Sequence, residues 1–392
     1  MRSFKNFLDK YKINENIDSN NDWKKEFIKI EKGFIPPSNL RPIIQAFLDS
    51  NEIVLMQDTS KEIKMPRKNL YLCGGSVRDF LRNKTQKNYN LTTNATPEQI
   101  ILILENANFG NDHKDKKYYY LKDKKVIAVV NGDEFEIDNF KKKVNDRNEY
   151  TDDIVEDCKR RDLTINSLYI ELSRTDGENN KLYDPSKKGW YDITHGIINF
   201  VEDSEKHMES NPISMLRAIR FYSQHGEVKI DQEIKDLIKE HKNKLSNIPY
   251  EEIKKEFMKG LLSKDIDPIK YINNYKIFNV LDIIFPNMKF NLLFPKNFES
   301  SDKLIFLSWI LKGNSTTEIS RALSKWSYYE RRFIIFMQKL KYCKPNSYEK
   351  FIELRKISGV SDEQIKKWGN LFKYTNLEIH KRIINFYKFL KK

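Results

Sequence analysis

The sequence predicts an α+β fold, in which a head of mixed strands and helices is followed by an all-helical remainder. Up to about residue 200, short apolar runs bounded by Gly, Asn and Pro turns alternate with helical patterns. From residue 213 to Phe389, apolar residues recur at helical spacing and strand signals are few. The 392 residues are also enough for two or more domains, each with its own buried core.

The elements of the head are predicted from its apolar runs and from the residues that bound them. In order, we expect a helix over 39–48, a buried strand with a glycine turn over 70–75, a short helix opened by Ser76, a helix from Pro97 and a hairpin over 124–140. Thr96 is an N-cap residue, with Pro97 at the first helical position and Glu98 in the first turn.

The hairpin has an Asn-Gly-Asp turn followed by apolar residues that alternate, namely Phe135, Ile137 and Phe140. Residues 1–35 are instead polar and rich in Asn and Lys. We expect them to form an arm with short amphipathic pieces, at Phe4, Phe7, Leu8 and Tyr11.

The charge balance favours a polyanionic partner. Lys and Arg number 70 against 56 Asp and Glu, which gives a net charge of +14 and points to nucleic acid. An AT-rich genome would also enrich Lys, Asn and Ile, so charge alone does not decide. The three cysteines have no metal-ligand spacing, which favours a reducing compartment. With no membrane span and no signal-peptide core in the sequence, we expect a cytoplasmic protein.

The run CGGSVRD, residues 73–79, is the first candidate for chemistry. Gly74 and Gly75 between a strand and a helix let the backbone approach a ligand and present N–H groups to an anion. Arg78, about one helical turn later, could bind phosphate through charge-assisted hydrogen bonds. Most Gly-Gly pairs are only turns, so this run alone is a weak signal.

The stretch KNYNLTTN, residues 87–94, places Asn88 and Asn90 two residues apart at the start of a strand. Residues with this spacing project to one face of a strand. In an active site, a pair of carboxylates in this arrangement holds a metal ion, whereas here both side chains are neutral amides. The pair is either a disarmed metal site or a polar strand edge.

Two further runs carry arginines. In RRDLTINSL the polar residues stand at the start of a predicted apolar helix, which favours a capped helix with a solvated basic end; they are Arg160, Arg161, Asp162, Thr164 and Asn166. In NPISMLRAIRF, Arg217 and Arg220 share a helical face and need an anionic partner, either a nucleotide or a structural salt bridge. Between these runs, YDPSKKGWYDITHGIINF predicts a Gly/Pro turn that leads into a short strand.

The order of these motifs resembles that of class II CCA-adding enzymes and bacterial poly(A) polymerases. GGSVRDFL, NYNLTTNATPEQI, EFEIDNFK, RRDLTINSL, YDPSKKGWYDI and NPISMLRAIRF follow one another as in that family, and the resemblance covers about residues 35–285. It implies a polymerase-β-like nucleotidyltransferase head over 36–200, a neck that binds the nucleotide base over 201–285 and an RNA-binding helical body and tail over 286–392.

The resemblance also implies an activity and a set of site residues. The family adds nucleotides from ATP or CTP to RNA 3′ ends, such as those of tRNA, with Mg²⁺ ions held by an Asp-x-Asp pair. Asn88 and Asn90 stand at that metal-binding and catalytic pair, with Glu136 beside them on the neighbouring strand. The residues implied to bind the nucleotide are Gly74, Gly75, Ser76, Arg78, Arg161, Asp162, Asn166, Asn211, Ser214, Arg217 and Arg220.

The sequence departs from the family pattern at three places. Asn88 and Asn90 replace both carboxylates, and because a neutral amide supplies neither the charge nor the proton acceptor, we expect catalysis to be severely impaired. Asn211 and Ser214 replace the Asp and Arg that select the base, and Lys187-Lys188-Gly189 replaces a Gly-Gly pair.

These departures leave several histories and functions open. The two amides fit a natural loss of the site, an isosteric pair introduced to trap a substrate, or a strand edge in a fold reused for structural purposes. The leading hypothesis is an RNA 3′-terminal nucleotidyltransferase that is disabled or descended from an active one. The alternatives are a non-catalytic RNA-binding protein and, with less support from the basic charge, a protein-interaction scaffold.

Overall fold

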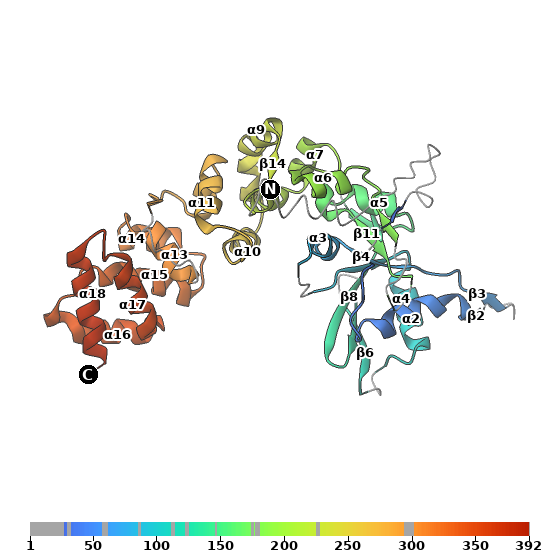
Figure 1. Ribbon diagram of the computed structural model, residues 1–392, viewed down its shortest axis with the longest axis horizontal. Coiled ribbons are helices and arrows are strands. Elements are labelled where there is room, and N and C mark those ends of the chain that lie inside the picture. The colour runs from blue at the N-terminus through green and yellow to red at the C-terminus, as the bar shows by residue number, and fades with distance from the viewer. Residues whose placement is uncertain are drawn as a thin grey trace. The chain divides into compact units, whose positions relative to one another are not determined.

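An α+β head followed by helices is the architecture of the computed structural model, as the sequence predicts (Figure 1). The structure describes residues 27–29, 33–56, 62–84, 88–110, 114–121, 125–145, 147–173, 176, 181–224, 228–293 and 302–391. Two compact units divide the chain: residues 1–210 with 227–231, and residues 211–226 with 232–392. The amphipathic pieces expected near Phe4 and Tyr11 lie outside the described residues. The boundaries expected at residues 35, 200 and 285 stay predictions.

The first unit is built on an eight-stranded sheet in the order β1-β12-β11-β4-β5-β8-β7-β6. Its strands, in that order, are Ile28–Lys29, Lys181–Tyr183, Tyr169–Glu171, Leu70–Cys73, Leu91–Thr93, Asp133–Asn139, Val126–Val130 and Lys116–Tyr120. Neighbouring strands are antiparallel except β5 and β8, which are parallel. This parallel pair brings the residues before Leu91 beside the middle of β8.

Shorter elements complete the first unit. Three two-stranded sheets pair β2 (Val54–Met56) with β3 (Glu62–Lys64), β9 (Lys141–Val144) with β10 (Arg147–Tyr150), and β13 (Ile197–Ile198) with β14 (Lys229–Ile230). The helices are α2 (Arg41–Leu48), α3 (Gly75–Leu81), α4 (Pro97–Asn106), α5 (Ile154–Lys159), α6 (Gly189–His195) and α7 (Ser204–Ser210), with 3-10 turns η1 (Asp49–Glu52) and η2 (Thr164–Asn166).

The two faces of the sheet carry different residues. On one face, Leu91 pairs with Leu72 and Ile137 in a buried row, and α4 packs on this sheet beside α2 (Figure 1). On the other face, a mainly aromatic core includes two residues of α5, Ile154 and Cys158; its other members are Tyr71, Cys73, Phe140, Tyr169 and Tyr183. Thus one face is filled with aliphatic side chains, and the polar candidates surround the aromatic core on the other.

Several predicted elements are confirmed. The expected helix over 39–48 is α2, and Thr96 caps α4 in a capping box with Gln99. The hairpin forms with Asn131 and Gly132 at φ of 51° and 88°, as a type I′ turn requires. One detail differs, because Asn139 rather than Phe140 continues the inward alternation of β8.

Three expected elements differ in the structure. Residues 160–172 form η2 and then β11 instead of a helix, because Tyr169, Ile170 and Glu171 pair with β4. The turn at 184–188 leads first into helix α6, and the expected short strand follows only after it, as β13 (Ile197–Ile198). Helix α3 begins at Gly75, so Ser76 lies inside its first turn and does not cap it. In the first two segments, tertiary pairing and packing override the local pattern.

The second unit consists almost wholly of helices. They are α8 (Ile213–Tyr222), α9 (Gln232–His241), α10 (Tyr250–Leu261), α11 (Pro268–Ile277), α12 (Leu281–Ile284), α13 (Lys303–Ile310), α14 (Thr316–Ala322), α15 (Tyr328–Leu340), α16 (Tyr348–Ser358), α17 (Asp362–Leu371) and α18 (Leu377–Leu390), with 3-10 turns η3 (Lys242–Asn247) and η4 (Pro345–Ser347). Within the described part of the chain, no helix has the length and apolarity needed to cross a membrane.

Candidate functional site

The glycine pair after β4 brings two arginines against the backbone. Gly74 adopts φ +61° and ψ −131°, a backbone conformation that residues other than glycine rarely adopt. A Cβ atom on Gly74 would lie 3.5 Å from Arg161 Nη1, and one on Gly75 would lie 3.4 Å from Arg78 Nη2. The turn therefore has two guanidinium groups beside it, which is the positive charge that an anionic ligand requires.

Arg78 connects α3 to the segment that contains η2. Its Nη1 donates to Asn166 Oδ1 at 2.6 Å, and its Nε and Nη2 donate to Asp79 Oδ1 at 3.0 and 2.7 Å. Two residues that are 88 positions apart in the sequence thus meet at the glycine turn. The structure brings together four of the predicted nucleotide-binding residues here: Gly74, Gly75, Arg78 and Asn166.

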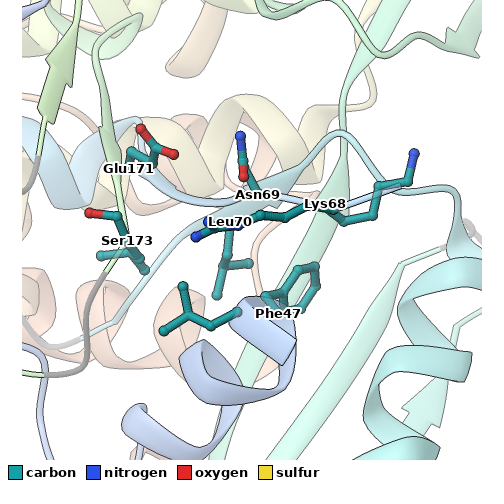
Figure 2. A pocket seen from close by; sticks show the side chains of 9 residues that line it. Phe47, Lys68, Asn69, Leu70, Glu171 and Ser173 are labelled. Atoms are coloured by element: carbon teal, nitrogen blue, oxygen red, sulfur yellow. The ribbon is translucent and has the colours of Figure 1, made fainter. Parts of the chain in front are cut away.

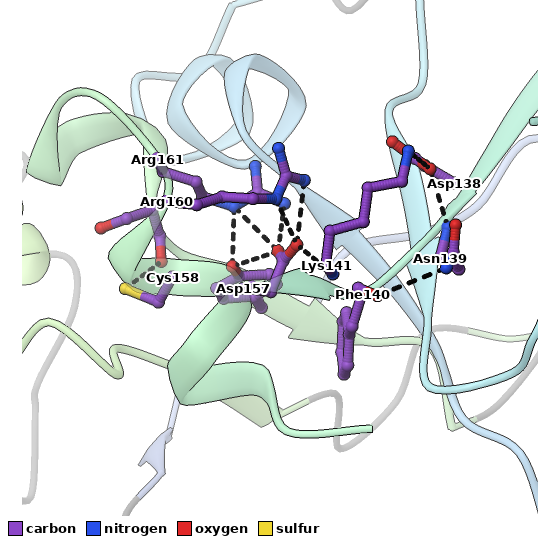
Figure 3. Close-up of polar contacts among 10 residues, drawn as sticks. Asp138, Asn139, Phe140, Lys141, Asp157, Cys158, Arg160 and Arg161 are labelled. Atoms are coloured by element: carbon purple, nitrogen blue, oxygen red, sulfur yellow. Dashed lines mark hydrogen bonds and ion pairs between the residues drawn. The ribbon is translucent and has the colours of Figure 1, made fainter. Parts of the chain in front are cut away.

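Arg161 belongs to a buried network centred on Asp157 (Figure 3). Arg161 Nη2 and Arg160 Nη2 lie 2.8 and 2.9 Å from the two carboxylate oxygens of Asp157, and the Tyr169 hydroxyl donates to Oδ2 at 2.7 Å. Burial favours the neutral acid, but Arg161, Arg160 and Tyr169 outweigh it and lower the pKa of Asp157 to about 2. The basic end expected to be solvated is therefore buried and paired.

Asp157 and Tyr169 were not among the residues predicted from the sequence. Asp157 stands three and four residues before the arginines, a spacing that places all three on one side of a helical turn. That spacing was the available signal for Asp157. Tyr169 reaches the network only because β11 pairs with β4, which no local pattern reveals.

Asp162 has a different role in the structure from Arg161. Its carboxylate oxygen accepts from the backbone N–H of Leu163 at 2.8 Å, and its carbonyl accepts from Val201 at 3.1 Å. Nearby, Thr164 Oγ1 donates to the buried Asp192 at 2.6 Å. These bonds hold residues 162–164 against the segment after α6. A contact of Asp162 with ribose stays a prediction.

Asn88 and Asn90 lie just before β5, and both side chains are exposed. Between them, Tyr89 turns inward and packs against Phe34 and Phe135, with ring centroids 6.1 Å apart in each pair. Because Tyr89 points into the protein, the two amides lie on its outer side. The expected placement on the outer side is therefore reproduced, although the strand begins one residue later, at Leu91.

Ser76 fixes the position of this segment. Asn90 N–H donates to Ser76 Oγ at 2.8 Å, and Ser76 Oγ lies 3.1 Å from both the Asn88 carbonyl and Asn90 Oδ1. Asn90 also accepts from the backbone N–H of Cys73 at 2.9 Å. The two amides are thus held next to the glycine turn by α3, and the pair is more than a loose strand edge.

Glu136 lies beside Asn90 in the sheet. In the parallel pair, Leu91 is opposite Ile137, so the preceding residues Asn90 and Glu136 are neighbours on the face opposite this buried row. Glu136 is already ion-paired, with Lys125 Nζ 2.5 Å from its Oε1. The next acid on the same face of β8, Asp138, is paired with Lys141 Nζ at 2.6 Å.

These residues do not fit the Mg²⁺ ions that the family resemblance implies. An amide oxygen can ligate Mg²⁺, but Asn88 and Asn90 supply no negative charge to balance the cations, and Glu136 is paired with a lysine. Among the described residues, no group of three or more His, Cys, Asp or Glu is placed to hold a metal ion.

The remaining predicted residues belong to the second unit, on and just before α8. Arg220 Nε is 2.5 Å from the buried Glu256 of α10. Of the two partners expected for Arg220, a nucleotide or a structural salt bridge, the structure shows the salt bridge. Arg217 is half-buried on the same helix. The Asn211 carbonyl accepts from Ser214 N–H at 3.0 Å, and the Ser214 hydroxyl is buried with no hydrogen-bond partner among the described residues.

A small pocket of about 170 Å³ lies elsewhere, at the start of β4 and the end of α2 (Figure 2). It lies at the end of β4 opposite the glycine turn, and it has no enclosed space for a small molecule. Its lining includes Phe47, Lys68, Leu70 and Glu171. We therefore place the candidate site at the glycine turn and not in this pocket.

Comparisons with known proteins place this site within a described domain. Residues 70–199 match the poly A polymerase head domain. A CCA-adding enzyme of Lactobacillus helveticus is 30% identical over 197 residues, which are 48% of this chain and 45% of that protein. A poly(A) polymerase I of Escherichia coli O157:H7 is 27% identical over 256 residues, 63% of this chain and 52% of that protein. The chain spans about half the length of the curated relatives it matches.

Solved structures share the fold of the chain. A Bacillus stearothermophilus CCA-adding enzyme in complex with CTP superposes with a TM-score of 0.65 at 19% identity, covering 90% of this chain and 82% of that one. A Thermotoga maritima CCA-adding enzyme complexed with tRNA gives a TM-score of 0.61 at 18% identity over the same shares of the two chains. At these identities the likeness concerns the fold.

Proposed function

The chain belongs to the family of CCA-adding enzymes and poly(A) polymerases, and from this premise we propose that it binds RNA 3′ ends and a nucleoside triphosphate without transferring the nucleotide. In this proposal it is an RNA 3′-terminal nucleotidyltransferase by descent. The observation that carries it is the contrast at the glycine turn. Two arginines expected to meet the triphosphate lie there, ion-paired with Asp79 and Asp157, while Asn88 and Asn90 supply no carboxylate for a metal ion.

The nucleotide-binding half of the proposal rests on the basic cluster. Arg78 and Arg161 both lie against the glycine turn, and Asn166 holds Arg78 in place at 2.6 Å. Fixed guanidinium groups bind phosphate oxygens with good geometry. Relatives solved with CTP and with tRNA, together with the net charge of +14, support the same ligand classes for this chain. Free, buried cysteines fit a reducing compartment, and we propose the cytoplasm.

The loss of transfer follows from the chemistry of the two amides. Phosphoryl transfer of this type needs carboxylates that bind metal and help to activate the attacking hydroxyl. Asn88 and Asn90 supply neither the negative charge nor a proton acceptor. Base selection by residues 211 and 214 would also differ from that of the family, because Asn211 and Ser214 replace charged residues.

Extension of labelled RNA tests this proposal. The chain and its Asn88→Asp/Asn90→Asp variant are incubated with Mg²⁺, labelled ATP or CTP, and either tRNA or a short RNA, while RNA binding is measured in parallel. We expect the chain to bind RNA without extending it, and the variant to extend it at a rate at least about 100-fold above that of the chain. An Asn39→Asp variant, which adds an acid to the same unit but outside the site, is the charge control.

The outcomes separate the alternatives. Extension by the unaltered chain contradicts the proposed loss of transfer. If neither protein extends RNA but both bind it, the chain is an RNA-binding protein that has lost more of its site than the two carboxylates. Absence of RNA affinity in both proteins contradicts the proposal as a whole.

A further inference from the structure

Lys125 lies where the metal site would need negative charge. It immediately precedes β7, and its ammonium is 2.5 Å from Glu136, the acid that is next to Asn90 across the β5–β8 pair. The side chains of Lys125 and Glu136 are 27% and 47% exposed. Ion pairs exposed to this extent contribute little to stability, so the stability of the fold does not explain why the pair is there.

The pair makes this part of the site electrically neutral without any metal ion. With carboxylates at positions 88 and 90, Glu136 would be the third acid of a strongly negative pocket. In this chain the amides carry no charge, and Lys125 neutralises Glu136 while Lys141 neutralises Asp138. A divalent cation at Glu136 would be repelled by the Lys125 ammonium and would gain a single carboxylate as a charged ligand.

The amides themselves favour an anion over a cation. Asn90 Oδ1 lies 3.1 Å from Ser76 Oγ, which engages the atom that could ligate a metal. Its NH₂ group supplies two hydrogen-bond donors, as does that of Asn88, and a carboxylate has none. Both residues stand beside the glycine turn that holds Arg78 and Arg161. Donors and positive charge therefore surround the position at which the family resemblance implies metal ions.

We propose that the Lys125 ammonium, paired with Glu136, keeps divalent cations out of the site, so that the head binds a triphosphate in its metal-free form. This inference rests on the proposed function, because it assumes that the triphosphate binds at the glycine turn. It adds that Lys125 excludes metal from the site. Restoring the two aspartates alone therefore leaves a lysine that competes with the cation for Glu136.

Binding of Mn²⁺, followed by the loss of the free-ion electron paramagnetic resonance signal, tests the exclusion without reference to activity. Four proteins are compared: the unaltered chain, Asn88→Asp/Asn90→Asp, the same double variant with Lys125→Gln, and the double variant with Lys159→Gln. Lys159 is the charge-matched control, since it pairs with Glu156 on α5, away from β8. We expect no saturable site in the unaltered chain and about tenfold tighter Mn²⁺ binding when Lys125 is removed from the double variant.

The control variant should bind Mn²⁺ as the double variant does. Equal affinities of the double variant and its Lys125→Gln derivative would overturn the role of Lys125. So would a saturable Mn²⁺ site in the unaltered chain that is as tight as that of the double variant. Circular dichroism of each variant establishes that the comparison is made between folded proteins.

Calorimetric titration of ATP into the unaltered chain tests the metal-free ligand. We expect binding in EDTA that is at least as tight as in Mg²⁺, because Mg²⁺ neutralises part of the charge on the triphosphate. ATP binding that needs Mg²⁺ overturns this inference and leaves the proposed function intact. ATP binding in neither condition contradicts the nucleotide-binding part of the proposed function, whereas the Mn²⁺ series still decides the role of Lys125.

Discussion

At the scale of single residues, the site depends on one carboxylate that accepts bonds from several partners. Asp157 is fully buried and ion-paired with both Arg160 and Arg161, and the Tyr169 hydroxyl and the Lys141 backbone N–H also donate to it. A buried charge with this many donors is satisfied, but removal of its charge leaves the arginines without a counterion. Asp157 therefore positions Arg161 against Gly74.

Replacement of Asp157 by Asn should destabilise the head by about 3 kcal/mol at neutral pH, because two buried or half-buried guanidinium groups lose their anion. The pKa of Asp157 is lowered from 3.8 to about 2, so its stabilising effect is present above pH 3.8 and is lost as the pH falls toward 2. Urea unfolding measured between neutral pH and pH 2 should show a larger loss of stability in the unaltered chain than in Asp157→Asn, in which the other carboxylates still titrate.

Asp236→Asn provides the matched control. Asp236 also has a lowered pKa, but it lies on the surface of α9 and its partners are Gln232 and Lys239. Its replacement should leave the free energy of unfolding unchanged. If Asp157→Asn is as stable as Asp236→Asn at neutral pH, the network around Asp157 does not hold the head together.

At the scale of elements, α10 and α11 in the second unit pack so closely that only glycine fits at position 260, against Tyr271. A Cβ atom on Gly260 would overlap Tyr271 Cζ and Oη and lie 2.7 Å from Cε2. Tyr271 cannot easily move away, since it is buried and its hydroxyl bonds to the Phe257 carbonyl and to Tyr275. The amphipathic pattern of α10 predicts which face is buried and gives no indication of how closely a neighbour approaches it.

Gly260→Ala should lower the free energy of unfolding by about 1–3 kcal/mol, despite the better helix propensity of alanine, because the added methyl group displaces Tyr271. Thermal unfolding followed by circular dichroism at 222 nm is the measurement. Gly313→Ala is the control, because nothing lies within 4 Å of a Cβ atom at Gly313. Equal melting temperatures for the two variants would show that α10 and α11 are not in such close contact.

At the scale of the whole molecule, the excess of basic residues favours polyanions in general and does not select one RNA sequence. The net charge of +14 comes from the helical part of the chain, because residues 211–392 carry 35 Lys and Arg against 20 Asp and Glu, whereas residues 1–210 carry 35 against 36. Binding of a polyanion by dispersed Lys and Arg residues is driven largely by the release of counterions, so it depends strongly on salt and weakly on sequence. Base-specific contacts would add a component that salt does not remove.

RNA affinity should therefore fall at least about tenfold between roughly 50 and 200 mM salt, with a linear slope of log K against log salt concentration. Fluorescence anisotropy with a labelled tRNA and a labelled short RNA measures this slope. The Lys125→Gln variant, which removes one positive charge, should reduce the slope by no more than about one. An affinity that does not change with salt would contradict binding through the basic residues.

The sequence by itself determined the elements whose signals are local, and the tertiary structure decided the contacts between distant segments. Thr96 and its capping box, the Asn131-Gly132 turn and the strand–glycine turn at Gly74 depend on neighbours within a few residues, so the sequence predicted them. The order of motifs also predicted the fold, whereas the replacement of two carboxylates by Asn88 and Asn90 stays a prediction. By contrast, residues 160–172 resembled a helix and became a strand, because pairing with β4 satisfies their backbone groups. Likewise, the parallel pairing of β5 with β8 brings Glu136 beside Asn90, whereas the β7–β8 hairpin places Lys125 next to Glu136.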